Sequence, residues 1–285
     1  MKQEQKRRRF GWRGFLLCLF GLIFLASTGV TAWVLLSHHK ADVAIQELRD
    51  LARKSSVDSG ETMGGADAAL SEGEDVSDGD VQPPLDRQIS MDFSELQQVN
   101  GDIIGWLYGE GTNIDYPVLR AEDNDYYLEH LYNGEVNANG SLFADFRNRG
   151  DFSDRNTVIY GHHMANGAMF GSLELYRDQD FYETVPTMML YTPEGDYLVE
   201  LISGTHENGY DDGFMSFEFE SDEEFLQYVD SFRARSTFQS DVVVKPGDRL
   251  ISLCTCAYVF DNARYMVIGR LVELYETEEA DTQLP

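Results

Sequence analysis

The sequence predicts a mainly β fold, a barrel or a sandwich with few helices. Short apolar runs recur from residue 103 to residue 275, and Gly, Asn, Asp and Pro separate them. Turn-forming stretches, TPEGD at 192–196 and KPGD at 245–248, lie between runs and favour strand reversal. Hydrophobic residues make up 42% of the chain, which is enough to bury a core. The runs are IIGWLY, GSLFAD, NTVIYGH, TMMLYT, DYLVELISGT, RLISLCTC and RYMVIGRLVELY.

The N-terminus combines a basic flank with a long uncharged run. Residues 14–36 carry no charge and are long enough to cross a bilayer as a helix. A cleaved signal peptide is the alternative, but the run exceeds the usual cleavable core and continues through WVLL. The basic residues within 1–13 should stay in the cytoplasm. We therefore expect a single-pass protein of the cell membrane whose folded domain is extracellular.

A short helix and a linker should follow the membrane segment. Ile45, Leu48 and Ala52 lie at helical spacing within 41–54. Residues 55–88 consist mostly of Gly, Ser, Asp and Glu and cannot bury a core. The expected organisation is a basic N-terminus at 1–13, a transmembrane anchor at 14–36, a short helix and flexible acidic stalk at 37–88, a folded domain at 89–276 and an acidic tail at 277–285.

A first helix of the folded domain is expected after Asp92. Glu95 stands three residues later, as in a capping box. Phe93, Leu96 and Val99 follow at helical spacing, which predicts a short helix with one apolar side.

A longer helix is expected at 221–236. Ser221 can cap its start, and acidic residues fill its first turn. Arg233 and Arg235 lie in its last turn, which suits the helix dipole. Its buried face should consist of Phe225, Tyr228, Val229 and Phe232.

The net charge of −28 limits the partners of this protein. A surface so acidic repels nucleic acid, so we expect no DNA or RNA partner. The simplest interpretation is a solvated acidic surface.

Cys254 and Cys256 lie one residue apart in RLISLCTCAYVFDNARYMVIGRL. A disulfide between alternate residues of a strand would be strained. Structural zinc sites and redox pairs usually show longer cysteine spacings, so neither is favoured. Side-chain alternation directs both thiols to one face, where one could react and the other line the wall. A reactive cysteine needs a base or a positive charge nearby.

Arg264 and a histidine are candidates for those groups. The stretch CAYVFDNAR is typical of a hairpin, which would put Arg264 beside the end of the first strand. There it could hold a peptide carbonyl or an oxyanion, or it could be a surface arginine. His162 and His163 follow a strand and a glycine, where functional side chains often lie, although a lone histidine is more often structural. The remaining histidines, without a partner pattern, are His38, His39, His130 and His206.

Together these segments resemble the class B sortases, membrane-anchored cysteine transpeptidases of Gram-positive bacteria. The resemblance covers roughly residues 89–274 and rests on three segments in the family's order. It implies a sortase-type closed β-barrel, with an N-terminal helix and a long helix before the last strands. The three segments are NGDIIGWLYGEGTNIDYPVLRAEDNDYYLEH, then GSLFAD with NTVIYGHHMANGAMFGSL, then ISLCTCAYVFDNARYMVIGRL.

The resemblance also implies the catalytic residues. His162 follows the Tyr-Gly pair, Cys256 ends the SLCTC motif, and Arg264 stands on the following strand. Two positions depart from the family's T-L-x-T-C pattern: Ser252 replaces its first Thr, and Cys254 stands where Ser or Thr is common. Neither departure removes a catalytic group. His163 takes a position where the family often has Asn.

The implied reaction is transpeptidation. The cysteine attacks the carbonyl of a threonine in the C-terminal sorting motif of a secreted protein, and an amine of a cell-wall precursor or a pilin lysine resolves the thioester. The membrane is contacted through the N-terminal helix, and no metal or cofactor is expected. Two other functions stay open from the residues: a cysteine peptidase that mainly hydrolyses, and a non-enzymatic surface protein that keeps the barrel.

Overall fold

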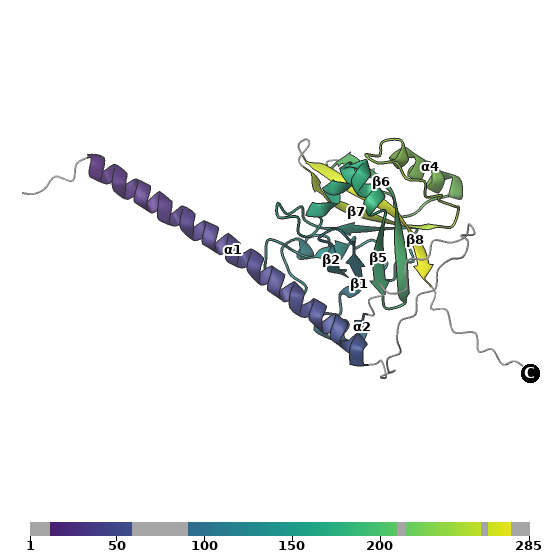
Figure 1. Ribbon diagram of the computed structural model, residues 1–285, viewed down its shortest axis with the longest axis horizontal. Helices are drawn as coiled ribbons and strands as arrows, with labels where there is room; N and C mark the ends of the chain where they lie inside the picture. Colours follow the sequence, from purple (N-terminus) through teal and green to yellow (C-terminus); the bar gives the residue numbers. More distant parts are fainter. Residues whose placement is uncertain (1–11, 59–90, 210–214, 258–261, 275–285) are drawn as a thin grey trace, which may run out of the picture. The chain divides into compact units, whose positions relative to one another are not determined.

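The apolar runs form a closed barrel. The computed structural model describes residues 12–58, 91–209, 215–257 and 262–274. Within them the strands neighbour one another in the order β1-β2-β3-β4-β7-β8-β6-β5, and β5 pairs with β1 to close the barrel. Figure 1 shows the barrel, with β1, β2, β5, β6, β7 and β8 labelled. The prediction of a closed barrel is therefore confirmed. The strands are β1 Ile103–Tyr108, β2 Asp115–Leu119, β3 Leu142–Ala144, β4 Asn156–Tyr160, β5 Thr187–Thr192, β6 Gly195–Asn208, β7 Arg249–Ala257 and β8 Ala263–Leu274.

The barrel mixes parallel and antiparallel pairs. β2 and β3 run parallel, and so do β4 and β7, while the other neighbours are antiparallel. A parallel pair needs a crossover connection, and between β4 and β7 the chain passes through β5, β6 and several helices. This crossover brings the end of β4 beside the end of β7.

β2 is the strand that the apolar runs did not predict. Pro117 stands in its middle, and a proline normally argues against a central strand because it lacks an N–H. In the barrel Pro117 lies opposite Trp106 of β1, whereas the pairing with β3 begins only at Val118. The proline therefore has a strand neighbour on one side only.

The short helix α2 begins as predicted. The Asp92 side chain accepts a hydrogen bond from the Glu95 backbone N–H at 3.1 Å. Phe93 and Leu96 are buried, but Val99 is 45% exposed, so its expected place on the apolar side is wrong. Val99 is the last residue of this helix, where the packed side has ended. The helices are α1 Trp12–Asp58, α2 Phe93–Val99, η2 Tyr126–Leu128, η3 Gly171–Arg177, α3 Gln179–Thr184 and α4 Asp222–Arg233.

The chain divides into two compact units, residues 1–44 and residues 45–285. α1 is one continuous helix, so the expected span at 14–36 and the expected short helix at 41–54 belong to one element. It reaches Asp58, so residues 55–58 are helical, whereas 59–88 of the expected stalk lie outside the described residues. By length and composition, Phe15–Arg53 could cross a membrane, a property that a signal sequence shares.

Within the second unit, the last turns of α1 pack on the barrel. Ile45, Leu48 and Ala52 are buried, as their spacing predicted. Arg49 donates two hydrogen bonds to the backbone carbonyl of Asp115, at 2.7 and 3.0 Å. These contacts join the helix end to β2.

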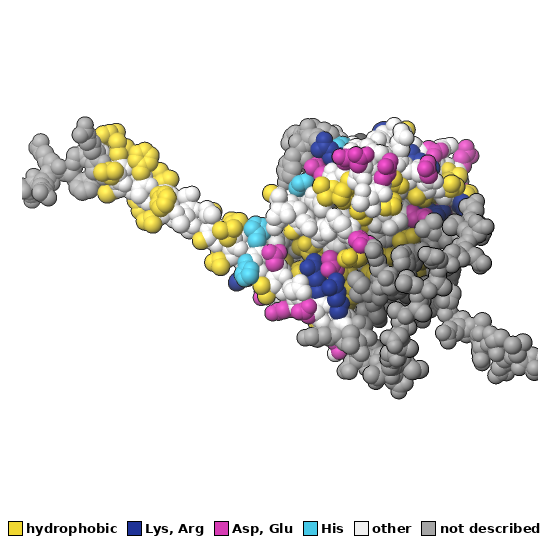
Figure 2. Space-filling view, in the orientation of Figure 1, with side chains coloured by type: hydrophobic (Ala, Val, Ile, Leu, Met, Phe, Trp, Pro, Cys, Tyr) yellow, Lys and Arg dark blue, Asp and Glu magenta, His cyan; other side chains and the backbone are white. Residues whose placement is uncertain are grey.

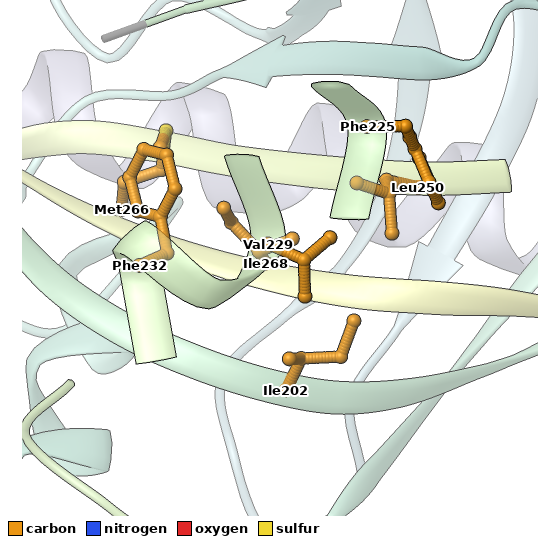
Figure 3. Packing of buried hydrophobic residues seen from close by; sticks show 7 residues of the cluster. All are labelled: Ile202, Phe225, Val229, Phe232, Leu250, Met266 and Ile268. Carbon is orange, nitrogen blue, oxygen red and sulfur yellow. The ribbon is translucent and has the colours of Figure 1, made fainter. Parts of the chain in front are cut away.

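α4 covers one face of β6, β7 and β8. Ser221 caps the helix by accepting a hydrogen bond from the Glu224 N–H at 3.2 Å. Acidic side chains gather on this side of the second unit, and α4 contributes three in its first turn (Figure 2). The buried face is largely as predicted, with Tyr228 only partly buried. The cluster that it forms with the strands is Ile202, Phe225, Val229, Phe232, Leu250, Met266 and Ile268 (Figure 3).

α4 ends at Arg233, earlier than the expected end at 236. Arg235 therefore lies beyond the last helical turn, and its side chain reaches Glu207 instead of the helix carbonyls alone. Arg235 still donates to the Ser231 carbonyl of the last helical turn at 3.1 Å, and it adds an ion pair with Glu207 of β6 that the sequence did not predict.

Candidate active site

The backbones of Cys256, Arg264 and His162 lie at, or just beyond, the ends of neighbouring strands. Cys256 of β7 lies opposite Arg264 of β8 in the antiparallel register, as the predicted hairpin requires. On its other side β7 runs parallel to β4, with Tyr160 opposite Cys254 and the Gly161 N–H donating to the Cys254 carbonyl at 3.2 Å. His162 is two residues past Tyr160, as Cys256 is two past Cys254. Cys256 and Arg264 are thus opposed in the β7–β8 pair, and His162 follows the end of β4 on the other side of β7.

The His162 ring is fixed by a backbone carbonyl. Its Nε2 lies 2.7 Å from the carbonyl oxygen of Leu128, at the end of η2. Since a carbonyl oxygen only accepts, Nε2 carries the proton, and Nδ1 is the nitrogen left for proton exchange. Sequence reasoning missed Leu128 because a main-chain acceptor leaves no signal in residue type.

Gly161, just before His162, allows the end of β4 to pack closely. A Cβ at this position would collide with the side chains of Leu142 and Phe170. Phe170 also returns to the site, because its N–H donates to the His162 carbonyl at 3.0 Å. The glycine noted in the sequence therefore places the histidine against the barrel wall.

Arg264 is partly buried and has few partners. Its Nη1 donates to the carbonyl of Ala263 at 3.2 Å, and among the described residues it forms no ion pair. Its guanidinium carbon would lie 3.0 Å from a Cβ built on Gly209, so the head group rests over the end of β6. Most of its donors are therefore available to a ligand.

Of the two cysteines in β7, Cys254 is buried. Cys254 is 2% exposed and lies opposite Met266, one of the residues under α4. The side chain of Cys256 lies outside the described residues, whereas its backbone belongs to β7. No group of three or more His, Cys, Asp or Glu side chains suited to a metal ion occurs in the part of the chain that the structure describes.

The remaining histidines have other neighbours. His163 forms an isolated bridge with Met169, and His130 stacks on Tyr126 with ring centroids 4.1 Å apart. His206 lies on β6 opposite Tyr265, and burial lowers its pKa, with the charge of Arg177 adding to the shift. His38 and His39 lie in α1.

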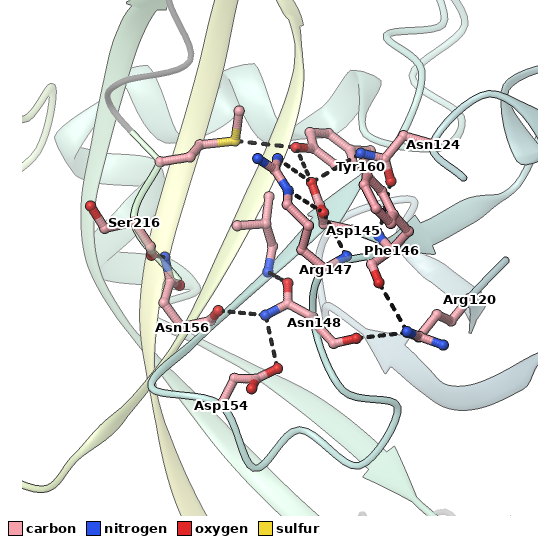
Figure 4. A network of polar contacts seen from close by, with 12 residues as sticks. Arg120, Asn124, Asp145, Phe146, Arg147, Asn148, Asp154, Asn156, Tyr160 and Ser216 are labelled. Carbon is pink, nitrogen blue, oxygen red and sulfur yellow. Dashed lines mark hydrogen bonds and ion pairs between the residues drawn. The ribbon is translucent and has the colours of Figure 1, made fainter. Parts of the chain in front are cut away.

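A buried carboxylate, Asp145, organises the strand next to the site (Figure 4). Arg147 donates to both of its oxygens, at 2.8 and 2.7 Å, and the Tyr160 hydroxyl and the Asn124 amide donate at 2.9 and 3.0 Å. Burial alone would raise the pKa of Asp145, but these hydrogen bonds, chiefly those from Arg147, hold it below its usual value. Burial and the nearby carboxylate raise the pKa of Tyr160, which keeps its proton on the hydroxyl.

The same network holds the segment before α4. The Tyr160 hydroxyl lies 3.2 Å from the Met215 sulfur, and the Asn156 amide donates to the Ser216 carbonyl at 2.8 Å. The Arg147 guanidinium lies 4.2 Å from the centre of the Phe217 ring. Residues 215–217 are thereby joined to β4, the strand that carries His162 at its end.

Comparison with known proteins identifies relatives of this chain. No family model matches the chain. Sortase B of Listeria monocytogenes is 37% identical over 187 residues, which cover 65% of this chain and 76% of that protein. Sortase B of Staphylococcus aureus is 34% identical over 184 residues, 64% of this chain and 75% of that protein. A crystal structure of the S. aureus protein superposes with a TM-score of 0.61 and 33% identity, and covers 64% of this chain and 87% of that structure.

The relatives are covered over more than two thirds of their length, and the superposed structure shares the barrel fold. The resemblance inferred from the three sequence segments is therefore confirmed. This chain belongs to the class B sortases, a family of cysteine transpeptidases.

Proposed function

We propose that this protein is a membrane-anchored transpeptidase with Cys256 as nucleophile, His162 as general acid and base, and Arg264 as the group that orients the substrate. The substrate is the C-terminal sorting motif of a secreted protein, cleaved after a threonine. The acceptor is an amine of a cell-wall precursor or of a pilin lysine. The observation that carries the proposal is that Cys256 lies opposite Arg264 on β8, while β4, which His162 follows by two residues, pairs with β7 on its other side.

The first half of the reaction forms a thioester. The Cys256 thiolate attacks the threonine carbonyl carbon, and Arg264 donates hydrogen bonds to the oxyanion. The carbon–nitrogen bond then breaks, and His162, an imidazolium whose Nδ1 carries the proton taken from the Cys256 thiol, gives this proton to the departing amine. A histidine whose Nε2–H is held by Leu128 can perform this transfer through Nδ1 without turning its ring.

The second half reverses the proton transfer. The acceptor amine attacks the thioester carbonyl, His162 takes a proton from it, and the Cys256 thiolate leaves. The product is a peptide bond between the threonine and the acceptor. Relatives support both substrates: a structure of S. aureus sortase B, 32% identical over 64% of this chain and 85% of that one with a TM-score of 0.61, holds a substrate, and another sortase B structure is a complex with triglycine.

The N-terminal apolar helix supports the membrane anchor. The uncharged run at 14–36 follows a basic segment, and by the usual charge rule this order favours a barrel on the extracellular side. A barrel held there meets secreted proteins and cell-wall precursors as they emerge.

The test is to trap the acyl-enzyme and follow its fate. Full-length protein in detergent is mixed with peptides that contain candidate sorting motifs, and intact mass spectrometry detects the thioester. Adding an amine acceptor should convert it into a joined peptide. If hydrolysis dominates at high acceptor concentration, the chain is a peptidase and the transpeptidase proposal fails.

A matched pair of variants identifies the nucleophile. Cys256→Ala should abolish the thioester, whereas Cys254→Ala should retain it because that buried thiol lies opposite Met266, two residues along β8 from Arg264. The reverse result would assign the reaction to Cys254. A folded wild-type protein that forms no thioester with any of the peptides would favour a surface protein that keeps the barrel without its chemistry.

A further inference from the structure

Two glutamates of β6 face two arginines of β8 in the same antiparallel register. Glu200 lies opposite Arg270, and Glu207 lies opposite Arg264. The first pair forms an ion pair, in which Arg270 Nε donates to Glu200 Oε2 at 2.9 Å and Nη2 contacts the same oxygen. This pair shows what these residue types do when they meet across β6 and β8.

Glu207 and Arg264 form no ion pair, because the Glu207 carboxylate binds Arg235 instead. Arg235 Nη1 donates to both oxygens of Glu207, at 2.7 and 2.9 Å. The Glu207 side chain is only 8% exposed, so its charge depends on this partner. Arg264, directly opposite, forms no ion pair with any residue that the structure describes.

Arg235 is held in place by the end of α4. Its Nε donates to the Ser231 carbonyl at 3.1 Å, and its guanidinium lies 4.9 Å from the centre of the Phe232 ring. Phe232 is itself buried beside Met266 of β8, two residues from Arg264 (Figure 3). The packing of α4 therefore fixes where the Arg235 charge lies.

Without Arg235, Glu207 would take Arg264 as its counterion. Opposed side chains of an antiparallel pair have Cβ atoms about 4.5–5.5 Å apart, so the guanidinium can reach the carboxylate with no change in the backbone. An uncompensated buried carboxylate is costly, which drives that movement. An arginine bound in this way has lost donors and charge that a developing oxyanion would need.

We propose that Arg235 is a positioning residue for transpeptidation: it binds the buried Glu207 carboxylate and so keeps Arg264 available to the sorting peptide. The inference rests on the proposed role of Arg264. It assigns Arg235 no contact with substrate; its effect passes through Glu207 alone.

The test compares Arg235→Ala with the double variant Arg235→Ala/Glu207→Gln in the full-length protein. We expect Arg235→Ala to lower kcat/KM for the sorting peptide by about 10- to 100-fold, because Arg264 is captured. The double variant also removes the Glu207 carboxylate that would bind Arg264, and it should recover most of the lost activity. Arg149→Ala, which removes an exposed arginine before β4, is the charge-matched control and should behave as wild type. Circular dichroism melting shows whether each variant is folded.

A second measurement reports on Arg264 independently of turnover. In 15N-arginine-labelled protein, the Arg264 Nε–H resonance, assigned with Arg264→Lys, should shift in Arg235→Ala and return in the double variant. Equal activity loss in the single and double folded variants, or an unmoved resonance, overturns the proposal. A wild-type protein that forms no thioester refutes the proposed function instead, and the resonance still decides whether Glu207 captures Arg264.

Discussion

Arg264 and Arg270 lie on the same face of β8 and differ in how completely they are bound. Met266 and Ile268 lie between them on that face, buried beneath α4. Arg270 contacts Glu200, donates to the Val243 carbonyl at 2.8 Å and lies 3.6 Å from Asp248. Arg264 has a single hydrogen bond, to its neighbour Ala263, within the described residues. One face of β8 thus carries Arg270, which has several protein partners, at one end and Arg264, which has one among the described residues, at the other.

This difference suggests that Arg270 contributes to the stability of the fold, whereas Arg264 contributes to binding and catalysis. Donors that are satisfied within the protein contribute to folding, since breaking them leaves buried acceptors unpaired. Donors that are left unpaired at a partly buried position contribute to binding a ligand, because they are already oriented for it. The two ends of β8 should therefore respond to the same substitution in opposite ways.

The largest expected effect is the loss of activity on substitution of Arg264. Arg264→Ala should lower kcat for transpeptidation by about 10²–10³-fold, the usual effect of removing one oxyanion donor. Its unfolding free energy should change by less than about 0.5 kcal/mol, since no ion pair is lost. Steady-state kinetics and urea unfolding of the same sample measure both. A destabilised, fully active variant would reverse the comparison.

The buried carboxylate of Asp145 extends the comparison to a group that accepts hydrogen bonds from Arg147, Tyr160 and Asn124. Asp145→Asn should cost about 3 kcal/mol of unfolding free energy at pH 7, because the Arg147 and Tyr160 donors lose a charged acceptor. The pKa of Asp145 is lowered in the folded protein, so its stabilisation is complete above the usual carboxyl range, near pH 4, and is lost as the pH falls through the lowered value.

Urea unfolding of wild type and Asp145→Asn at a series of pH values tests this. The gap between the two should narrow below about pH 4, where the carboxyl gains a proton and resembles the amide. A gap that is constant down to acid pH would mean that the charge contributes nothing and that only packing was changed.

Arg270→Ala should have a smaller effect on stability and none on the chemistry. Glu200 keeps some solvent contact when its partner is removed, so we expect a loss of about 2 kcal/mol. The activity per folded molecule should match wild type, which active-site titration can establish. If this variant lost kcat instead, the division of β8 into two ends would be wrong.

The local part of this architecture was predictable from the sequence. The runs that became β1, β5, β7 and β8 have apolar side chains bounded by turn residues, and Ser221 marks the start of α4. The hairpin that pairs Cys256 with Arg264 follows from the chain alone, since its strands are consecutive. The choice of catalytic residues came from the family resemblance and stays a prediction.

The long-range part was not predictable in this way. The parallel pairing of β4 with β7 joins segments far apart in the chain, and no residue type encodes it. The Leu128 carbonyl beside His162 is a main-chain group, so any residue could supply it. Arg235 looked like a helix-terminal cation because Glu207, its partner on β6, is recognisable only when the barrel is folded.

The smallest expected effect tests whether α4 acts on the site through Arg235 alone. Ser221→Ala removes the N-terminal cap of α4 and should cost about 1 kcal/mol of unfolding free energy. The lost hydrogen bond is at the opposite end of the helix from Phe232 and Arg235, which stay packed against β8 and Glu207. Activity at a temperature well below melting should therefore equal wild type, although Arg235→Ala loses it. If Ser221→Ala lost activity in proportion to its stability, α4 would support the site as a whole rather than through one ion pair.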